Sequence, residues 1–320
     1  MLPWRAVFSR LSPAGAKARL AVLIFHRVLP QPDPLFPGEV DAARFDTLCG
    51  WLKRWFNVLP LNEAARRMAQ GRLPSRAAAI TFDDGYADNC TVAMPILQRH
   101  GLCATFFVAT GFIDGGRMWN DTVIESVRHA PGPQLDLVGT AFAELGVLPL
   151  ATVEDRREAI QRLIMAAKYR PPLERQHSVD SLTRLADRPL ADDLMMTSDQ
   201  VRALAGASMQ VGAHTVNHPI LTGLPRERIL DEVRDSRAWL EEILRSPVGL
   251  FAYPNGKPGP DYGPEAVEVV RELGFEAAVS TVPAMARAGG DRWQIPRYTP
   301  WDRTPNRFAL RLARQYAAPG

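Results

Sequence analysis

Apolar and polar positions fall into two patterns along the chain: short apolar runs, and longer stretches in which apolar residues recur at helical spacing. The apolar runs are bounded by polar or turn-forming residues, which is typical of buried strands. They cover residues 20–25, 77–82, 104–108, 209–211, 250–252 and 277–280. We therefore expect a strand in each of these six segments.

Helices are predicted between the strands from the signals at their ends. Thr197 is followed by Gln200 in a capping-box pattern. Pro225 opens a long stretch with apolar residues at helical spacing, and Glu and Arg are expected on its opposite side. The stretch 265–273 ends at Gly274, a common helix stop. Because strands and helices alternate, the sequence predicts a parallel sheet or barrel.

The segment from about 114 to 193 departs from this alternation. It contains two charged helical patterns, at 122–129 and 153–167, and no convincing strand. We therefore expect an insertion on the core fold. Because loops and insertions over a scaffold often carry specificity, this segment is predicted to form a lid or a wall of a substrate site.

Composition narrows the class of protein. With 320 residues, 46% hydrophobic and 23% charged, the chain is expected to form a soluble globular protein, and one domain is the simpler interpretation. The formal net charge of +3 arises from scattered residues of both signs. No nucleic-acid partner is expected, because such a groove requires clustered Lys and Arg. Arginine is frequent near both ends, which leaves peripheral contact with an anionic membrane surface open.

Cysteine usage and the N-terminal region bear on location. Cys49, Cys90 and Cys103 form no CxxC pair, and their odd number favours a reducing compartment. The apolar run at 20–25 is short and meets His26-Arg27 without a small-residue cleavage site, so a buried strand is expected there instead of a secretion signal. We therefore expect a cytoplasmic location, with the inner face of the membrane as a place of contact.

Two adjacent carboxylates, Asp83 and Asp84, directly follow the predicted strand 77–82 in the sequence Thr-Phe-Asp-Asp-Gly. Parallel folds build their sites at this end of their strands. Neighbouring buried carboxylates repel each other, which favours a cation beside them. The alternative is an acidic turn that merely ends the strand.

Two imidazoles, those of His214 and His218, lie four residues apart just after the predicted strand 209–211. This spacing lets both rings reach one ion, and the alternative is a pair of structural histidines. Two histidines and one carboxylate make a common open metal shell. Since Asp83-Asp84 is the acidic cluster at another strand end, a ligand and a catalytic base are both expected from it.

The two motifs together resemble those of polysaccharide deacetylases of the NodB-homology type, and the resemblance runs from about Ala21 to Arg297. It implies an α/β fold, a distorted (β/α) barrel with about seven parallel strands. The core of this single domain would cover about 21–300, with the helical insertion at about 114–193. The resemblance also implies catalytic and metal-binding roles. Asp83 would be the base, and the metal ligands would be Asp84, His214 and His218.

The chain departs from the family pattern at two catalytic positions. Ala252 stands where the third motif, Arg-x-Pro-x-Gly, normally carries the Arg that orients the base. Arg297 is the candidate substitute, and the alternative is a surface salt-bridge residue. The late His that acts as the acid is also missing, because no histidine follows His218. Some subfamilies place it on the first strand, so His26 is the candidate acid, with a core histidine as the alternative.

Substrate contacts are expected from three parts of the chain. The resemblance implies that the backbone N–H of Tyr86 binds the developing oxyanion. Trp119 opens the insertion and is a candidate for stacking against a sugar ring, and Asp121 is expected to orient a catalytic group. The remaining candidates lie on the third motif and are Tyr253, Pro254 and Asn255.

These residues predict a metal-dependent hydrolase that removes acetyl groups from N-acetylated sugars of a bacterial-type poly- or oligosaccharide, giving acetate and a free amine. The expected cation is Zn²⁺, and Co²⁺, Ni²⁺ and Mn²⁺ suit the same ligands. Two alternatives stay open. The same site suits an esterase that removes O-acetyl groups, and the missing Arg and late His suit a catalytically silent sugar-binding protein.

Overall fold

The computed structural model describes residues 4–318. Contacts within the chain divide it into two compact units. The first combines Gly38–Asp114 with the segments before Gln31 and after Met196, and the second combines Pro32–Pro37 with Gly115–Met195. The main segment of the second unit lies where an insertion was expected at 114–193. Each unit has a hydrophobic core of its own.

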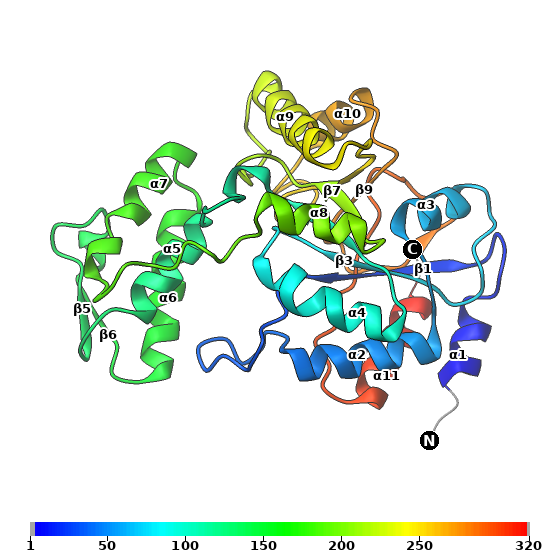
Figure 1. The fold of residues 1–320 in the computed structure, drawn as a ribbon, viewed down its shortest axis with the longest axis horizontal. Helices are drawn as coiled ribbons and strands as arrows, with labels where there is room; N and C mark the ends of the chain where they lie inside the picture. Colours follow the sequence, from blue (N-terminus) through cyan, green and yellow to red (C-terminus); the bar gives the residue numbers. More distant parts are fainter. Residues whose placement is uncertain (1–3, 319–320) are drawn as a thin grey trace. The chain divides into compact units, whose positions relative to one another are not determined.

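A curled sheet forms the centre of the first unit (Figure 1). Its parallel strands are β1 (Arg19–Phe25), β2 (Asn57–Val58), β3 (Ala77–Phe82), β4 (Thr105–Val108), β7 (Gln210–Ala213), β8 (Leu250–Ala252) and β9 (Ala277–Val279). They follow the order β1-β3-β4-β7-β8-β9, with β2 paired to β3. The short strand β10 (Ala286–Arg287) runs antiparallel beside β1. The predicted distorted barrel with about seven parallel strands is confirmed, and all six predicted strands are present.

The segment 295–298 lies between the two ends of this strand order. On one side, the N–H of Ile295 donates to Ala278 of β9, and on the other the N–H of Tyr298 donates to Val22 of β1 (2.9 and 2.7 Å). Both pairings are parallel. The segment therefore bridges β9 and β1, and it places Arg297 among the strands.

Helices connect the strands of the first unit, and two more, α1 (Trp4–Leu11) and α11 (Pro305–Ala317), precede the first strand and follow the last one. The connecting helices are α2 (Ala42–Trp55), α3 (Leu61–Ala69), α4 (Met94–His100), α8 (Ser198–Gly206), α9 (Arg226–Leu244) and α10 (Pro264–Glu272). A π-helical turn, Asn89–Ala93, leads into α4. The capping box of Thr197 with Gln200 is present at the start of α8 as predicted. The predicted helix after Pro225 is α9, and the one before Gly274 is α10.

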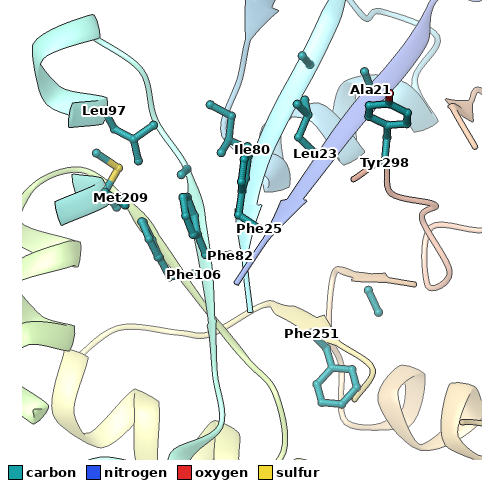
Figure 2. Packing of buried hydrophobic residues seen from close by; sticks show 14 of the residues in the cluster. Ala21, Leu23, Phe25, Ile80, Phe82, Leu97, Phe106, Met209, Phe251 and Tyr298 are labelled. Carbon is teal, nitrogen blue, oxygen red and sulfur yellow. The ribbon is translucent and has the colours of Figure 1, made fainter. Parts of the chain in front are cut away.

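The core of the first unit contains a row of aromatic rings on neighbouring parallel strands (Figure 2). Phe82 of β3 stacks on Phe25 of β1 and on Phe106 of β4, with ring centroids 5.3 and 4.8 Å apart. All three rings are at most 4% exposed. Because Phe82 immediately precedes the two aspartates, this packing fixes the end of β3 that carries them.

The second unit packs three helices against a short hairpin. The helices are α5 (Trp119–Arg128), α6 (Val153–Lys168) and α7 (Pro172–Asp180), and the hairpin strands are β5 (Gln134–Asp136) and β6 (Val147–Pro149). The expectation of no strand in this segment is wrong. Each strand buries one side chain, Leu135 or Leu148, so its three residues give no alternating pattern long enough to recognise.

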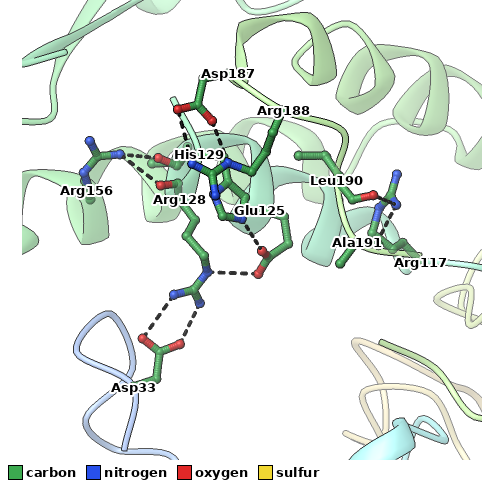
Figure 3. A network of polar contacts seen from close by, with 11 residues as sticks. Asp33, Arg117, Glu125, Arg128, His129, Arg156, Asp187, Arg188, Leu190 and Ala191 are labelled. Carbon is green, nitrogen blue, oxygen red and sulfur yellow. Dashed lines mark hydrogen bonds and ion pairs between the residues drawn. The ribbon is translucent and has the colours of Figure 1, made fainter. Parts of the chain in front are cut away.

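Charged side chains tie the loop 32–37 to α5 within the second unit (Figure 3). Arg128 binds Asp33 through both terminal nitrogens, at 3.2 and 2.6 Å, and its Nε donates to Glu125. A bidentate arginine–carboxylate pair fixes both position and orientation. This pair explains why residues 32–37 belong to the second unit, although they are distant from it in sequence.

None of the helices in the described part of the chain combines the length with the apolar character that crossing a membrane requires.

Buried tyrosines predict a loss of stability at alkaline pH. Burial raises the pKa of Tyr316, which is 1% exposed, above its ordinary value, whereas in the unfolded chain the phenol ionises near about pH 10. Its contribution to stability is therefore complete below about pH 10 and is lost as the pH rises toward the folded-state pKa. Tyr316→Phe should make the decline of the unfolding free energy above about pH 10 shallower by about 1 kcal/mol per pH unit.

Urea unfolding at a series of pH values measures this slope. Tyr169→Phe is the matched control, because Tyr169 is 75% exposed and should leave the slope unchanged. Equal slopes for wild type and Tyr316→Phe would contradict the assignment of Tyr316 as a buried, neutral phenol.

Candidate metal centre and catalytic site

The turn after β3 places two buried carboxylates side by side. Asp83 continues the strand, since its N–H donates to the carbonyl of Phe25 on β1 (3.0 Å), whereas Asp84 has a φ of 76°. This left-handed conformation is uncommon for a residue other than glycine and ends the alternation of the strand. Asp83 and Asp84 are 3% and 8% exposed. The turn therefore supplies two carboxylates with little contact to solvent.

The loop after β7 supplies the two imidazoles. His214 extends β7, because its N–H donates to Val108 of β4 (3.1 Å). The chain then turns through two further left-handed residues, Thr215 with a φ of 66° and His218 with a φ of 50°. The hydroxyl of Thr215 accepts the N–H of His218 at 3.0 Å, which closes the turn. The loop thus directs both rings to one place.

Asp84, His214 and His218 converge as the sequence predicted. The Nε2 atoms of both rings lie 3.4 Å from Oδ1 of Asp84, and the three ligand atoms lie within 4.8 Å of one another. Two ligands of a tetrahedral zinc ion, each about 2.0–2.1 Å from it, are separated by about 3.3–3.4 Å. Nδ1 of His214 binds the carbonyl oxygen of Ala252 at 2.7 Å, which leaves Nε2 available as a ligand. The donor set therefore fits a divalent cation.

Asp83 binds Arg297 instead of the histidines. Nη1 and Nη2 of Arg297 each donate to one oxygen of Asp83 at 2.6 Å, and Nε donates to the carbonyl of Ser280 at 2.8 Å. Arg297 is 1% exposed, so the alternative of a surface salt-bridge residue is wrong. Arg297 thus makes the contact with Asp83 that was expected from the arginine missing at position 252. Its guanidinium fixes the plane of the Asp83 carboxylate.

The charges of these groups set their protonation. Burial is the largest influence on Asp83 and opposes its ionisation, but the charges of Arg297 and His214 and the hydrogen bonds from Arg297 together outweigh it and lower the pKa of Asp83 below its ordinary value. Burial likewise opposes ionisation of Asp84, yet the hydrogen bond with His214 and the charge of His218 contribute to lowering its pKa below the ordinary value. Burial lowers the pKa of His218 to about 4. Burial opposes the charged form of His214, yet the hydrogen bond with Asp84 and the charges of both carboxylates raise the pKa of His214 above its ordinary value, so the site favours positive charge.

His26 lies at the end of β1 and is exposed, so the alternative of a core histidine is wrong. It directly follows Phe25, whose carbonyl accepts the N–H of Asp83, so it lies at the same end of the sheet as the two aspartates. Asp88 fixes the backbone beside it, because its carboxylate accepts hydrogen bonds from Nε of Arg27 (2.8 Å) and the N–H of Val28 (3.0 Å).

Four of the residues expected to contact substrate also belong to the first unit. Tyr86 is 4% exposed, and the guanidinium of Arg27 lies 4.6 Å from the centre of its ring. Tyr253 is fully buried and stacks on Tyr262 with ring centroids 3.9 Å apart. Pro254 is buried as well, whereas Asn255 is exposed. A substrate contact by Tyr253, Pro254 or Asn255 stays a prediction, and the burial of the first two leaves Asn255 as the accessible side chain of the three.

The other two candidates belong to the second unit. Trp119 is the first residue of α5, and the guanidinium of Arg175 lies 4.9 Å from its ring centre. Asp121 lies in the first turn of α5 and is 4% exposed. Their contact with a substrate stays a prediction.

The structure adds groups that the motifs did not reveal. The carbonyl of Ala252 orients His214, and the carboxylate of Glu232 on α9 binds the histidine loop. A backbone carbonyl leaves no signal in a sequence. Glu232 is 6% exposed, so the expectation that the glutamates after Pro225 lie on the side away from the core is wrong for this residue. Its position beside Val233 of the apolar face is a signal that sequence analysis could have used.

The fold and these motifs match known proteins. The family model described as "Polysaccharide deacetylase" matches residues 70–136 and 174–278, which is more than half of the chain. The Bacillus subtilis (strain 168) protein YxkH, whose name places it provisionally in the same family, is 20% identical over 271 residues, covering 84% of this chain and 67% of that protein. The chain belongs to the polysaccharide deacetylase family.

Solved structures share the fold at low sequence identity. Streptococcus pyogenes deacetylase PplD, solved in complex with acetate, aligns with a TM-score of 0.62 and 19% identity over 94% of this chain and 99% of that chain. A de-N-acetylase from Aggregatibacter actinomycetemcomitans aligns with a TM-score of 0.53 and 15% identity over 88% and 94%. At these identities the likeness establishes the fold alone.

Breaking the buried ion pair should destabilise the protein. Arg297→Met leaves Asp83 buried without its partner, and we expect a loss of about 3–5 kcal/mol of unfolding free energy in urea. Arg226→Met is the matched control, because the Arg226–Glu272 pair is 39% and 58% exposed and should cost less than about 1 kcal/mol. Similar losses for both variants would contradict the weight given to the Asp83–Arg297 pair.

Proposed function

We propose that this protein is a metal-dependent deacetylase that removes the acetyl group from N-acetylated sugars of a bacterial-type poly- or oligosaccharide. The observation that carries the proposal is the arrangement of Asp83, held by Arg297, beside three converging ligand side chains. A base next to a cation site is what hydrolysis of an unreactive amide requires. Family membership supports the same reaction class.

Asp84, His214 and His218 hold the cation, for which we propose Zn²⁺ because two imidazoles and one carboxylate suit it. When bound, the cation supplies Lewis acidity toward the acetyl oxygen and the attacking water. The three side chains leave further coordination positions open, as catalytic sites require.

Asp83 accepts the proton that the attacking water loses. Its lowered pKa keeps it ionised near neutral pH, and the bidentate contact with Arg297 fixes the direction of its oxygens. Arg297 is therefore a positioning residue. Its hydrogen bonds to Ser280 and Thr81 hold the guanidinium in place while the carboxylate changes its charge.

His26 delivers a proton to the leaving nitrogen, and the backbone N–H of Tyr86 donates to the oxygen that becomes negative. An amine leaves only when it is protonated, so an amide needs an acid more than an ester does. Two observations support this role: His26 is exposed, and it directly follows Phe25, whose carbonyl accepts the N–H of Asp83. Acetate and a free amino sugar are the products.

Removal of the cation ligand and removal of the base should have different effects. Asp84→Ala should lose both metal and activity, because it deletes one of three ligands. Asp83→Asn should retain metal and lose at least about 100-fold in kcat, because the amide accepts no proton. Metal content and acetate release from N-acetylated oligosaccharides, with and without chelator, measure both effects.

Asp199→Ala is the control for these variants, because the Asp199 side chain is 91% exposed and should leave metal and activity unchanged. A fully active Asp83→Asn enzyme would rule out Asp83 as the base. A wild-type enzyme that keeps its full activity after complete removal of metal would rule out the proposed metal dependence.

Loss of His26 should distinguish amides from esters. His26→Ala should reduce acetate release from N-acetyl sugars by about 100-fold or more, and release from O-acetyl sugars much less, because an alkoxide leaves with less need for an acid. His177→Ala, at an exposed histidine of α7, is the control. Equal losses on both substrates would contradict the assignment of His26 as the acid, and activity on O-acetyl sugars alone would favour an esterase.

A further inference from the structure

The loop that carries His218 is bound by a buried carboxylate from another element. Glu232 of α9 is 6% exposed. Its Oε2 accepts the N–H groups of Val216 and Asn217 at 2.9 and 2.8 Å, and its Oε1 accepts Nδ2 of Asn217 at 2.8 Å. Among residues 4–318, no arginine, lysine or histidine forms an ion pair with Glu232 that would account for its burial. All three of the hydrogen bonds described above come from the loop, which compensates for the burial of the carboxylate.

The loop needs such a partner because its conformation is unfavourable. Thr215 and His218, on either side of the residues that Glu232 binds, both have positive φ. Each such residue costs of the order of 1–3 kcal/mol and persists only where the surroundings enforce it. The N–H groups of Val216 and Asn217, which lie between these two residues, both donate to Glu232 and so supply that constraint.

The loop is also supported by the 3-10 turn Thr110–Phe112, which follows β4. The N–H groups of Thr110 and Gly111 donate to Thr215 and Val216 at 3.1 and 2.8 Å. Gly111 allows this approach, since a Cβ there would lie 2.8 Å from the carbonyl oxygen of Val216. The peptide groups of the loop are thus bound both by the 3-10 turn Thr110–Phe112 and by Glu232 of α9.

The two histidines depend on different supports. His214 is fixed by its N–H bond to Val108 and by the carbonyl of Ala252, neither of which involves the loop. The N–H of His218 donates to the hydroxyl of Thr215. His218 also directly follows Asn217, which donates two hydrogen bonds to Glu232, and Val216 donates a third. A change at Glu232 should therefore act on His218 and leave His214 in place.

We propose that Glu232 is a positioning residue that holds the His218 arm of the cation site in its ligating conformation. The inference rests on the metal site of the proposed function and extends it to a residue outside the motifs. Loss of a residue that orients a metal ligand typically weakens metal binding by about 10–100-fold.

Titration of the metal-free protein with Co²⁺ tests the inference without reference to turnover. Glu232→Ala should weaken Co²⁺ binding by about 10–100-fold and alter the visible absorption of the bound ion, because one imidazole is no longer held. Glu232→Gln should recover most of the affinity. Its amide oxygen still accepts both N–H groups, and the Asn217 amide can turn to accept from its nitrogen.

Two control variants separate positioning from general destabilisation. Val233→Ala removes a fully buried side chain next to Glu232 on α9 and should lower the free energy of unfolding with less than a twofold effect on Co²⁺ affinity. Glu242→Ala, at an exposed site of the same helix, should change neither. Loss of affinity in Val233→Ala equal to that in Glu232→Ala would overturn the inference.

Imidazole NMR signals of the metal-free protein give a second readout, assigned from His218→Ala and His214→Ala. In Glu232→Ala the signals of His218 should shift or broaden while those of His214 stay. Equal perturbation of both, or Co²⁺ affinity within twofold of wild type, would overturn the inference. If wild type and Glu232→Ala differ as expected but no variant releases acetate, the proposed function fails and the role of Glu232 stands.

Discussion

The bidentate contact between Arg297 and Asp83 is the interaction on which the rest of the site depends. Both side chains are nearly inaccessible to solvent, at 1% and 3% exposure, so neither charge is tolerated without the other. Arg297 belongs to the segment that bridges β9 and β1, and Asp83 belongs to the end of β3. The same contact therefore secures the closure of the sheet and the orientation of the proposed base.

Adjacent aspartates have different partners because the backbone conformation changes from extended at Asp83 to left-handed at Asp84. Asp83 keeps the strand conformation and meets a guanidinium, whereas Asp84 turns to positive φ and meets two imidazoles. A permanent positive charge beside Asp83 removes its need for a cation. Within residues 4–318, Asp84 pairs with His214 and His218 and with no arginine or lysine, so an added cation would be favoured beside it. This difference suits the proposed roles, in which one carboxylate takes a proton and the other binds a metal.

The sequence predicted the parts of this arrangement that are local. Strand positions and the two motifs follow from patterns within a few residues of one another. The convergence of Asp84 with the histidines, which are far apart in the chain, was predicted because both motifs follow strands and together resemble those of a known family. The hairpin of β5 and β6 was missed because three-residue strands with one buried leucine each carry no pattern. Glu232 was missed because its contacts lie in the fold, 14 or more residues from the histidine motif in the chain. The burial of Tyr253 could not be predicted from the third motif either, because it depends on stacking with Tyr262.

The contribution of position 252 to the site explains why it can carry an alanine instead of the arginine of the third motif. The structure uses the backbone of Ala252, whose carbonyl binds Nδ1 of His214, and a carbonyl is independent of the side chain. The guanidinium that the third motif normally supplies comes instead from Arg297, which reaches Asp83 from the neighbouring bridging segment. The chemistry constrains where the positive charge lies relative to the carboxylate, and the fold allows more than one segment to place it there. A missing motif residue is therefore weak evidence for a silent protein when a buried arginine of another segment pairs with the same oxygens.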